Sequence, residues 1–311
     1  MSEFTAPAPS IDQPAEVREE ERIDLSRIEP FLRRTLLDAA GSISIFQFPK
    51  GHSNLTYLVR VGDREVVLRR PPFGVKVKTA HDMKREYDIL SALNGVYARA
   101  PKPIAFCDDD SLIGAKFYLM ERVRGVILRG DKPPAGVTFS PELLRKTSTA
   151  LVDNLADLHA VDVTRPALAA IGRPQGYVGR QVAGWSERYF NAKTDEIPGV
   201  EAVAAWLSAN MPRESGAAVI HNDYKYDNVT LDPSDLTRIV AVFDWEMATV
   251  GDPLMDLGTF LGYWGDPDDP KELRARAYGP TYLPGSLSRL QLAERYAQTS
   301  GRSVLLVHRG A

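Results

Sequence analysis

Apolar and polar residues alternate along the first part of the chain in the pattern of paired strands. Apolar residues recur at every second position over 55–61, and the Gly-Asp pair at 62–63 is typical of a tight turn. The segment 66–69, Val-Val-Leu-Arg, then runs back along the first strand, so the pattern predicts a β-hairpin. A further pair of strands is predicted at 103–107 and 116–122.

Helical periodicity occurs in both halves of the chain. We predict a helix that Asp24 caps, and another over residues 79–93, whose apolar stripe includes Met83 and Leu90. Beyond Gly125 the chain becomes mainly helical. Helices with this periodicity are predicted over 141–160, 181–192 and 200–210, and short strands over 217–220 and 238–244.

These elements predict an α+β chain with two lobes and a cleft between them. Residues 1–23 contain Pro, Ser, Glu and Arg without an apolar core, so we expect a mobile, disordered tail. Residues 24–121 would form a small, mainly antiparallel β lobe that carries one important helix and binds nucleotide. Residues 122–311 would form a larger, mainly helical lobe with the catalytic and substrate-binding groups.

Composition and charge argue against several classes of function. The 311 residues carry a formal net charge of −3, which gives no indication of a nucleic-acid-binding protein. The single cysteine, Cys107, rules out an intrachain disulfide and suits a reducing compartment. No apolar stretch is long enough to cross a bilayer, and the N-terminus lacks the apolar core of a secretory signal. We therefore expect a cytoplasmic protein that binds neither nucleic acid nor membrane.

The densest cluster of polar residues runs from His221 to Asn228 and has the form H-x-D-x-K-x-x-N. An apolar strand follows it and ends at Asp244. Phosphoryl transfer needs an acidic group to orient the attacking hydroxyl, and oxygen ligands for Mg²⁺ on the phosphates of ATP. Asp223, Asn228 and Asp244 can supply these groups, whereas a plain polar turn would not require so many. The pattern predicts a kinase that uses Mg·ATP.

A buried ion pair is predicted in the β lobe. Glu86 falls on the apolar face of the helix over 79–93, where a carboxylate needs a cationic partner. Arg69, in the preceding strand, can supply the cation, as in the pair with which kinases hold the α- and β-phosphates, although an ordinary structural ion pair fits equally well. The polar loop at Ser53 and Asn54 could close over phosphates through its backbone N–H groups, or could be a simple hairpin turn.

On the basis of these motifs, the chain resembles the aminoglycoside phosphotransferase / choline kinase superfamily over nearly its whole length. That superfamily has a protein-kinase-like bilobal fold. The chain is most similar to the branch found as the kinase domain fused to some acyl-CoA dehydrogenases, because the His-x-Asp-Tyr and Leu-Arg-Arg-Pro-Pro runs point to that branch. The matching segments are 51–57, 67–72, 85–87, 120–122, 155–159, 221–228, 244–246 and 251–258.

The resemblance implies roles for the residues that match its motifs. Asp223 would be the catalytic base or would orient the substrate hydroxyl, and Lys225 would lie near the transferred phosphate. Asn228 and Asp244 would bind Mg²⁺. Residues 120–123 would form the hinge whose backbone receives adenine. The residues thereby assigned to ATP binding are Ser53, Asn54, Arg69, Glu86, Glu121 and Val123.

Four further residues are given structural roles. We expect His159 to be a packed core histidine and Glu246 to be a solvated turn residue instead of a second metal ligand. Asp256 would cap a helix over 257–264 and, by resemblance, also brace the catalytic loop. His221 would hold that loop in place.

The chain departs from the pattern of the family at two places. Arg69 stands where most kinases have lysine, so its forked donors would contact phosphate differently. Family members continue beyond 294–297 into further helices, whereas here the short apolar run 303–311 follows, which we interpret as a truncation or an altered reading frame. Apolar surface left by absent helices would favour association, so the chain could form a homodimer.

Several functions remain open at this point. The first is a kinase for a hydroxyl of a small molecule, with a hydroxyacyl-CoA or a hydroxy acid expected as acceptor before an aminoglycoside. The second is a nucleotide-binding pseudokinase with a regulatory role, which Arg69 and the short C-terminus suggest. Retention of Asp223, Asn228 and Asp244 favours the first, because a pseudokinase does not need all three. Transfer of AMP instead of phosphate is a third possibility.

Overall fold

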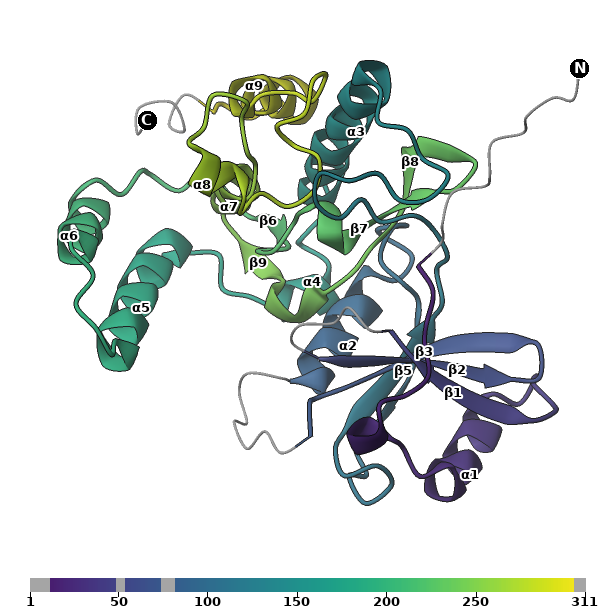
Figure 1. The fold of residues 1–311 in the computed structure, drawn as a ribbon. Helices are drawn as coiled ribbons and strands as arrows, with labels where there is room; N and C mark the ends of the chain where they lie inside the picture. The colour runs from purple at the N-terminus through teal and green to yellow at the C-terminus, as the bar shows by residue number, and fades with distance from the viewer. Residues whose placement is uncertain (1–11, 49–53, 74–81, 305–311) are drawn as a thin grey trace, which may run out of the picture.

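The structure, a computed structural model, describes residues 12–48, 54–73 and 82–304. A β-rich N-terminal lobe stands against a larger, mainly helical C-terminal lobe, and the chain passes between them after residue 121 (Figure 1). The predicted α+β arrangement, with a small antiparallel sheet and one helix against it in the first lobe, is confirmed.

The N-terminal lobe is built on one antiparallel sheet with the strand order β1-β2-β3-β5-β4. Its strands are β1 (Ile43–Gln47), β2 (Leu55–Val61), β3 (Arg64–Arg70), β4 (Pro103–Cys107) and β5 (Phe117–Glu121). The hairpin β2–β3 and the pair β4–β5 were predicted, whereas β1 was missed. The sequence of β1 is too short and too weakly alternating to stand out, and its position depends on pairing with β2.

Two helices cover the two faces of this sheet. Because side chains alternate along a strand, Val66 and Leu68 face α1 (Leu25–Thr35), while Val67 between them faces α2 (Met83–Leu93). Asp24 caps α1 as predicted, by accepting a hydrogen bond from the Ser26 N–H at 3.0 Å. Asp82 caps α2, and the predicted beginning of that helix, at 79–81, lies outside the described residues.

Residues 12–23 lie along the sheet, which differs from the predicted mobile tail. Ala15 exchanges two backbone hydrogen bonds with Gln47 of β1, at 2.7 and 2.8 Å. Val17 and Ile23 pack on the same apolar cluster as α1. Isolated apolar residues of this kind have no periodicity, so the sequence pattern gives no sign that they are anchored.

The C-terminal lobe surrounds two small two-stranded sheets with helices. Its first helices are α3 (Pro141–His159), α4 (Pro166–Ala169), α5 (Tyr177–Ala192) and α6 (Val200–Ala209). Its strands are β6 (Ala218–Ile220), β7 (Val229–Asp232), β8 (Asp235–Val242) and β9 (Thr249–Gly251). The last helices are α7 (Pro253–Gly262), α8 (Lys271–Arg274) and α9 (Arg289–Ser300). Strands β7 and β9 were not predicted, because three or four residues carry no readable alternation.

The prediction that Asp256 caps a helix over 257–264 is wrong. Helix α7 begins four residues earlier, at Pro253, and Asp252 caps it by accepting a hydrogen bond from the Leu254 N–H at 2.8 Å. Proline favours the first position of a helix, which explains the earlier beginning. Asp256 is therefore inside the helix, where its side chain is fully buried.

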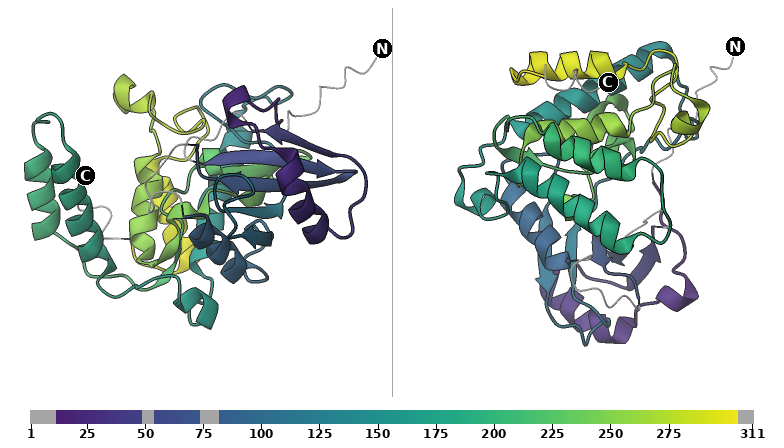
Figure 2. Two further views of the ribbon diagram at one scale, coloured as in Figure 1. Left: turned by 90° about the horizontal axis from the view of Figure 1, so that it is seen from below. Right: turned by 90° about the vertical axis from the view of Figure 1, so that its left-hand side faces the viewer.

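Helices α5 and α6 form a hairpin that stands away from the rest of the C-terminal lobe in two views (Figures 1 and 2). This hairpin exposes several large apolar side chains, among them Trp185, Val203 and Trp206. Within the described part of the chain no helix is long and apolar enough to cross a membrane. The C-terminal run 305–311, on which the predicted truncation partly rests, lies outside the described residues.

Alanine substitutions at two glycines test the β2–β3 turn. Gly62 has φ of +56°, and a Cβ atom there would lie 2.0 Å from the Ala40 carbonyl oxygen. Gly95 also has positive φ, +79°, but a Cβ atom there would meet nothing within 4 Å. We expect Gly95→Ala to lower the unfolding free energy by about 1 kcal/mol, and Gly62→Ala by about 3 kcal/mol or more. Urea unfolding measures both, and equal losses would contradict the close approach at Gly62.

Candidate active site

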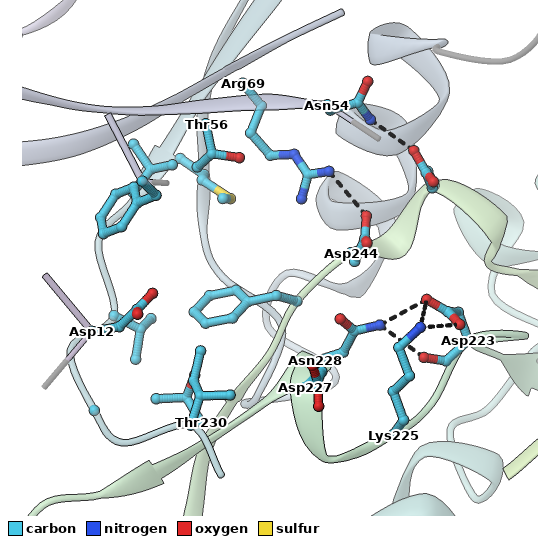
Figure 3. Close-up of a pocket in the computed structure, with 18 of the residues that line it drawn as sticks. Asp12, Asn54, Thr56, Arg69, Asp223, Lys225, Asp227, Asn228, Thr230 and Asp244 are labelled. Atoms are coloured by element: carbon cyan, nitrogen blue, oxygen red, sulfur yellow. Dashed lines mark hydrogen bonds and ion pairs between the residues drawn. The ribbon is translucent and has the colours of Figure 1, made fainter. Parts of the chain in front are cut away.

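A cavity of about 650 Å³ lies where the two lobes meet (Figure 3). This volume is within the range of small-molecule sites. The N-terminal lobe contributes Phe48, Asn54, Thr56, Val67, Arg69 and Met120 to its lining, and the connection between the lobes contributes Arg122, Val123 and Gly125. The C-terminal lobe contributes Asp223, Lys225, Asn228, Phe243 and Asp244 among others.

The loop after β6 presents Asp223 to this cavity, and Asp256 of α7 holds the loop in place. Backbone N–H groups of His221 and Asn222 each donate to the Asp256 carboxylate at 2.7 Å. Asn222 needs this support, because its φ of 62° is unfavourable for a residue with a side chain. Asp256 therefore braces the loop, as the family resemblance implied.

Two histidines complete this brace. His159, a buried core residue as predicted, donates from Nε2 to Asp256 at 3.1 Å and accepts at Nδ1 from the Tyr296 hydroxyl at 2.6 Å. His221 accepts at Nδ1 from the Asp223 N–H at 3.2 Å and donates from Nε2 to the Phe243 carbonyl at 2.9 Å. Burial alone would raise the pKa of Asp256, but the hydrogen bonds from the His159 side chain and the His221 backbone help to lower it below its usual value.

Asp223 lies between two hydrogen-bond donors from its own loop. Lys225 Nζ is 2.6 and 2.7 Å from the two carboxylate oxygens of Asp223. Asn228 donates from Nδ2 to Asp223 Oδ2 at 2.9 Å, so the amide oxygen of Asn228 is left for another partner. The ammonium of Lys225 also lies over the rings of Tyr263 and Tyr278, at 4.9 and 4.7 Å from their centroids. These contacts hold the lysine charge beside the carboxylate.

Arg69 joins the two lobes across the cavity. Its guanidinium lies 3.4 Å from Glu86 Oε1 of α2, which confirms the predicted ion pair, and 2.9 Å from Asp244 Oδ1, which follows β8. Glu86 is 1% exposed and also accepts from the Trp245 N–H at 3.2 Å. No sequence pattern indicated that one arginine would pair with two carboxylates, because the Asp244 contact depends on how the lobes meet.

The two carboxylates of this network respond differently to their surroundings. Burial raises the pKa of Glu86 to about 7. The charge of Arg69 lowers this pKa, whereas repulsion by Asp244 and Glu246 raises it further. Burial also disfavours the charge on Asp244, but Arg69 outweighs this effect and lowers the pKa of Asp244. At neutral pH, Asp244 is therefore the ionised partner of Arg69.

The prediction that Glu246 is a solvated turn residue is wrong. Its Oε2 accepts a hydrogen bond from Asn54 Nδ2 at 2.7 Å, and both residues line the cavity. Asn54 precedes β2, so this bond is a second link between the lobes (Figure 3). Glu246 lies within a short helical turn, Trp245–Met247, and sequence spacing cannot show that this turn faces the other lobe.

The other residues predicted to bind nucleotide are not all in the cavity. Val123 lines it, whereas the side chain of Glu121 is exposed and accepts from the Lys102 N–H at 2.8 Å. Glu86 does not line the cavity but holds Arg69, which does. Ser53 lies outside the described residues. Asp227 also lines the cavity, although the motif that contains it gave it no role. The sequence did not indicate Asp12, Thr56, Arg129 or Tyr278 as lining residues, because they come from separate segments without a shared motif.

Oxygen atoms suited to Mg²⁺ face one end of the cavity. Asn228 keeps its amide oxygen available, and Asp244 is ionised and partly exposed at its side chain. In the described residues no group of three or more His, Cys, Asp or Glu is placed to hold a metal ion. Mg²⁺ usually takes only one or two protein ligands and completes its shell with phosphates and water.

Comparisons with known proteins agree with this geometry. The profile of the phosphotransferase enzyme family matches residues 44–290. Among curated proteins, the chain is 36% identical over 258 residues to acyl-CoA dehydrogenase family member 11 of Gallus gallus, a match that covers 80% of this chain and 32% of that protein. The chain thus spans about a third of the length of this relative.

Solved structures are similar over most of the chain. A candidate aminoglycoside phosphotransferase from Ralstonia eutropha superposes with a TM-score of 0.75 at 30% identity, over 91% of this chain and 82% of that one. Choline kinase from Cryptosporidium parvum superposes with a TM-score of 0.61 at 12% identity, over 89% and 80%. The second likeness, at this identity, shows the fold alone.

Replacing Asp256 by asparagine tests the brace under the loop. Two backbone N–H groups and His159 donate to Asp256, so an amide in its place would oppose some of these donors. We expect Asp256→Asn to lower the unfolding free energy at pH 7 by about 3 kcal/mol. The exposed Asp157→Asn, whose side chain pairs with Arg99 at the surface, is the matched control and should change it by less than about 0.5 kcal/mol.

The effect of Asp256→Asn should depend on pH. Because the folded-state pKa of Asp256 is lowered, its charge stabilises the fold above the pKa of an unfolded aspartate. This contribution is lost as the pH falls through the lower, folded-state pKa. Urea unfolding at a series of pH values should therefore show the gap between wild type and variant closing towards acid pH. A gap that stays constant would contradict the ionised brace.

Proposed function

This chain belongs to the phosphotransferase enzyme family, and we propose that it transfers the γ-phosphate of ATP to a hydroxyl of a small molecule, with Mg²⁺ as cofactor. Phosphotransfer to a hydroxyl group is the activity that the family and the kinase neighbours indicate. The observation that carries the finer proposal is that Asp223, Asn228, Asp244 and Arg69 line one cavity between the lobes. ATP, Mg²⁺ and the roles below are our inferences from that arrangement.

Asp223 would orient the acceptor hydroxyl and take its proton. Its carboxylate is fixed by Lys225 and by Asn228 Nδ2, so it would meet the hydroxyl in a defined direction. Lys225 would place its ammonium near the phosphoryl group that is being transferred, because the rings of Tyr263 and Tyr278 hold this ammonium at the cavity. A charge already in place costs little reorganisation when negative charge develops.

The phosphate end of the cavity would lie between Arg69, Asn228 and Asp244. Asn228 and Asp244 would hold Mg²⁺ through their oxygen atoms, and the bound ion would neutralise charge on the phosphates. Arg69 would give part of its guanidinium to phosphate oxygens while Glu86 keeps it in place. In the structure Arg69 satisfies Asp244 directly, so nucleotide binding would exchange this ion pair for contacts with Mg·ATP.

The opposite end of the cavity would receive the adenine. Its walls are apolar, with Phe48, Val67 and Met120 from the N-terminal lobe and Phe243 from the C-terminal lobe. Backbone groups at Val123 would meet the edge of the base, because this residue lines the cavity directly after β5.

For the acceptor we propose a hydroxyacyl-CoA or a related hydroxy acid. The support is the similarity to acyl-CoA dehydrogenase family members, of which the chain spans about a third or less. An aminoglycoside, as a polycation, would need a cluster of available acids. Two neighbouring acids in the C-terminal lobe, Asp269 and Asp266, are already paired, because they lie 2.6 and 3.6 Å from Arg289. This pairing favours the anionic acceptor.

Transfer from Mg·ATP to a panel of acceptors tests the proposal. The panel contains hydroxyacyl-CoAs, hydroxy acids, sugars, choline and aminoglycosides, and mass spectrometry identifies a product that has gained phosphate. We expect a phosphorylated hydroxyacyl-CoA or hydroxy acid, and a loss of kcat of about 10²-fold to 10⁴-fold in Asp223→Asn. The matched control is Asp232→Asn, an acid in β7 that does not line the cavity.

Other products of the same experiment would contradict the proposal. A product that gains AMP would indicate nucleotidyl transfer. Tight nucleotide binding without any product would favour the pseudokinase. Transfer at the wild-type rate by Asp223→Asn would remove that residue from the chemistry.

Replacement of Lys225 by methionine tests the placed charge. Methionine keeps the length of the side chain and its packing on Tyr263 and Tyr278, but it has no ammonium. We expect kcat to fall about 10²-fold with a small change in the KM for ATP, because the charge acts mainly on the transition state. Lys84→Met, which removes an exposed lysine paired with Asp88, is the control. A rise in KM at constant kcat would contradict this role.

A further inference from the structure

Residues 12–18, here called the strap, run past the connection between the lobes and are held by both of them. Ala15 pairs with Gln47 in β1 of the N-terminal lobe. The Asp12 N–H donates to the carbonyl of Gly125, which lines the cavity after β5, at 3.2 Å. The strap is thus fixed at the end of the cavity where the base would enter.

Gly125 allows this close approach. A Cβ atom there would lie 2.3 Å from Thr230 Cγ2 and 2.4 Å from the Leu231 carbonyl oxygen. The backbone of the connection can therefore lie directly on β7, where it presents its carbonyl to Asp12.

Asp12 lines the cavity, where Arg129 pairs with its carboxylate and Arg122 holds its backbone carbonyl. Arg129 Nη1 lies 3.1 Å from Asp12 Oδ1, and Arg122 Nη2 donates to the Asp12 carbonyl at 3.3 Å. The side chain of Asp12 remains 30% exposed, so it stays accessible to a ligand. Figure 3 shows Asp12 on the opposite side of the cavity from Asp223 and Lys225.

The chemistry of this position selects one part of a nucleotide. An ionised carboxylate only accepts hydrogen bonds and repels phosphate, so its partner must be a donor without negative charge. The phosphate end, at Arg69 and Asp244, is elsewhere in the cavity. The amine of the adenine would point to the backbone after β5. The hydroxyls of the ribose are the donors that remain.

A second polar group in the same part of the cavity supports the same conclusion. Thr230 lines the cavity near Asp12 (Figure 3), and its residue is 1% exposed. Within the described part of the chain its hydroxyl has no hydrogen-bond partner. A buried hydroxyl without a partner is costly, which indicates that this end of the cavity is built to meet polar atoms of a ligand.

We propose that Asp12 is a nucleotide-binding residue that accepts a hydrogen bond from the ribose hydroxyls, so that the strap forms part of the nucleotide site. This inference rests on the proposed use of ATP. It assigns a function to a segment that the sequence pattern indicated to be a tail.

Deoxynucleotides test the proposal without any need to know the acceptor. The dissociation constants of Mg·ATP, Mg·2′-deoxy-ATP and Mg·3′-deoxy-ATP are measured by calorimetry for wild type, Asp12→Ala and Glu16→Ala. Glu16 is an exposed acid on the same strap that does not line the cavity, so its variant is the matched control. Asp12→Asn, which keeps the shape of the side chain, serves if Asp12→Ala does not fold.

For wild type and Glu16→Ala we expect ATP to bind roughly tenfold more tightly than at least one deoxynucleotide, as for a hydrogen bond to a charged group. In Asp12→Ala the affinity for ATP should fall by the same factor, and the deoxynucleotides should bind no more weakly than ATP. If Asp12→Ala still discriminates as wild type does, the ribose is recognised elsewhere and the inference is overturned. If wild type binds no adenine nucleotide, the proposed function itself fails and this inference with it.

Discussion

One buried guanidinium, that of Arg69, fixes how the two lobes meet. Arg69 comes from β3, and its partners come from both sides of the cavity, Glu86 from α2 and Asp244 from the end of β8. A buried charge without partners is very costly. If either carboxylate moved away, the buried guanidinium would lose a partner, so both carboxylates are held in place. The position of Asp244, which is strained at φ of 67°, follows from this pair. The phosphate end of the cavity therefore depends on it.

The catalytic loop has an independent support. Asp256 lies in α7 and receives hydrogen bonds from the backbone of the loop and from His159. This carboxylate is remote from solvent, and its donors keep it ionised. The loop can thus carry an unfavourable backbone at Asn222 while it presents Asp223 and Lys225 to the cavity. Two buried carboxylates thus position the site without contacting a substrate: Glu86 holds Arg69, and Asp256 holds the loop that carries Asp223.

The sequence predicted the parts of the site that lie in continuous motifs. The stretch from His221 to Asn228 indicated phosphoryl transfer because it concentrates acid, amide and lysine within one loop. The pair of Arg69 and Glu86 was predictable because a charge on an apolar helix face must have a partner. In both cases the information is local, or depends on one neighbouring strand.

The contacts that the sequence could not indicate are those between distant segments. Glu246 was taken for a solvated residue because its partner, Asn54, is far away in the chain and approaches only when the lobes fold. Asp256 was taken for the N-terminal cap because the beginning of the helix was placed four residues too late, whereas Asp252 caps it. Asp12 belongs to a segment without periodicity, and only its contacts with Gly125 and Arg129 bring it to the cavity.

The dependence of ATP affinity on Mg²⁺ tests the central claim most directly, because it does not require the acceptor to be known. Calorimetric titration of wild type and Asp244→Asn with ATP, in the presence and absence of Mg²⁺, measures it. We expect Mg²⁺ to tighten ATP binding to wild type and Asp244→Asn to lose most of this gain. Equal affinities with and without Mg²⁺ in wild type, or an undiminished gain in Asp244→Asn, would contradict the assignment of this cavity to Mg·ATP.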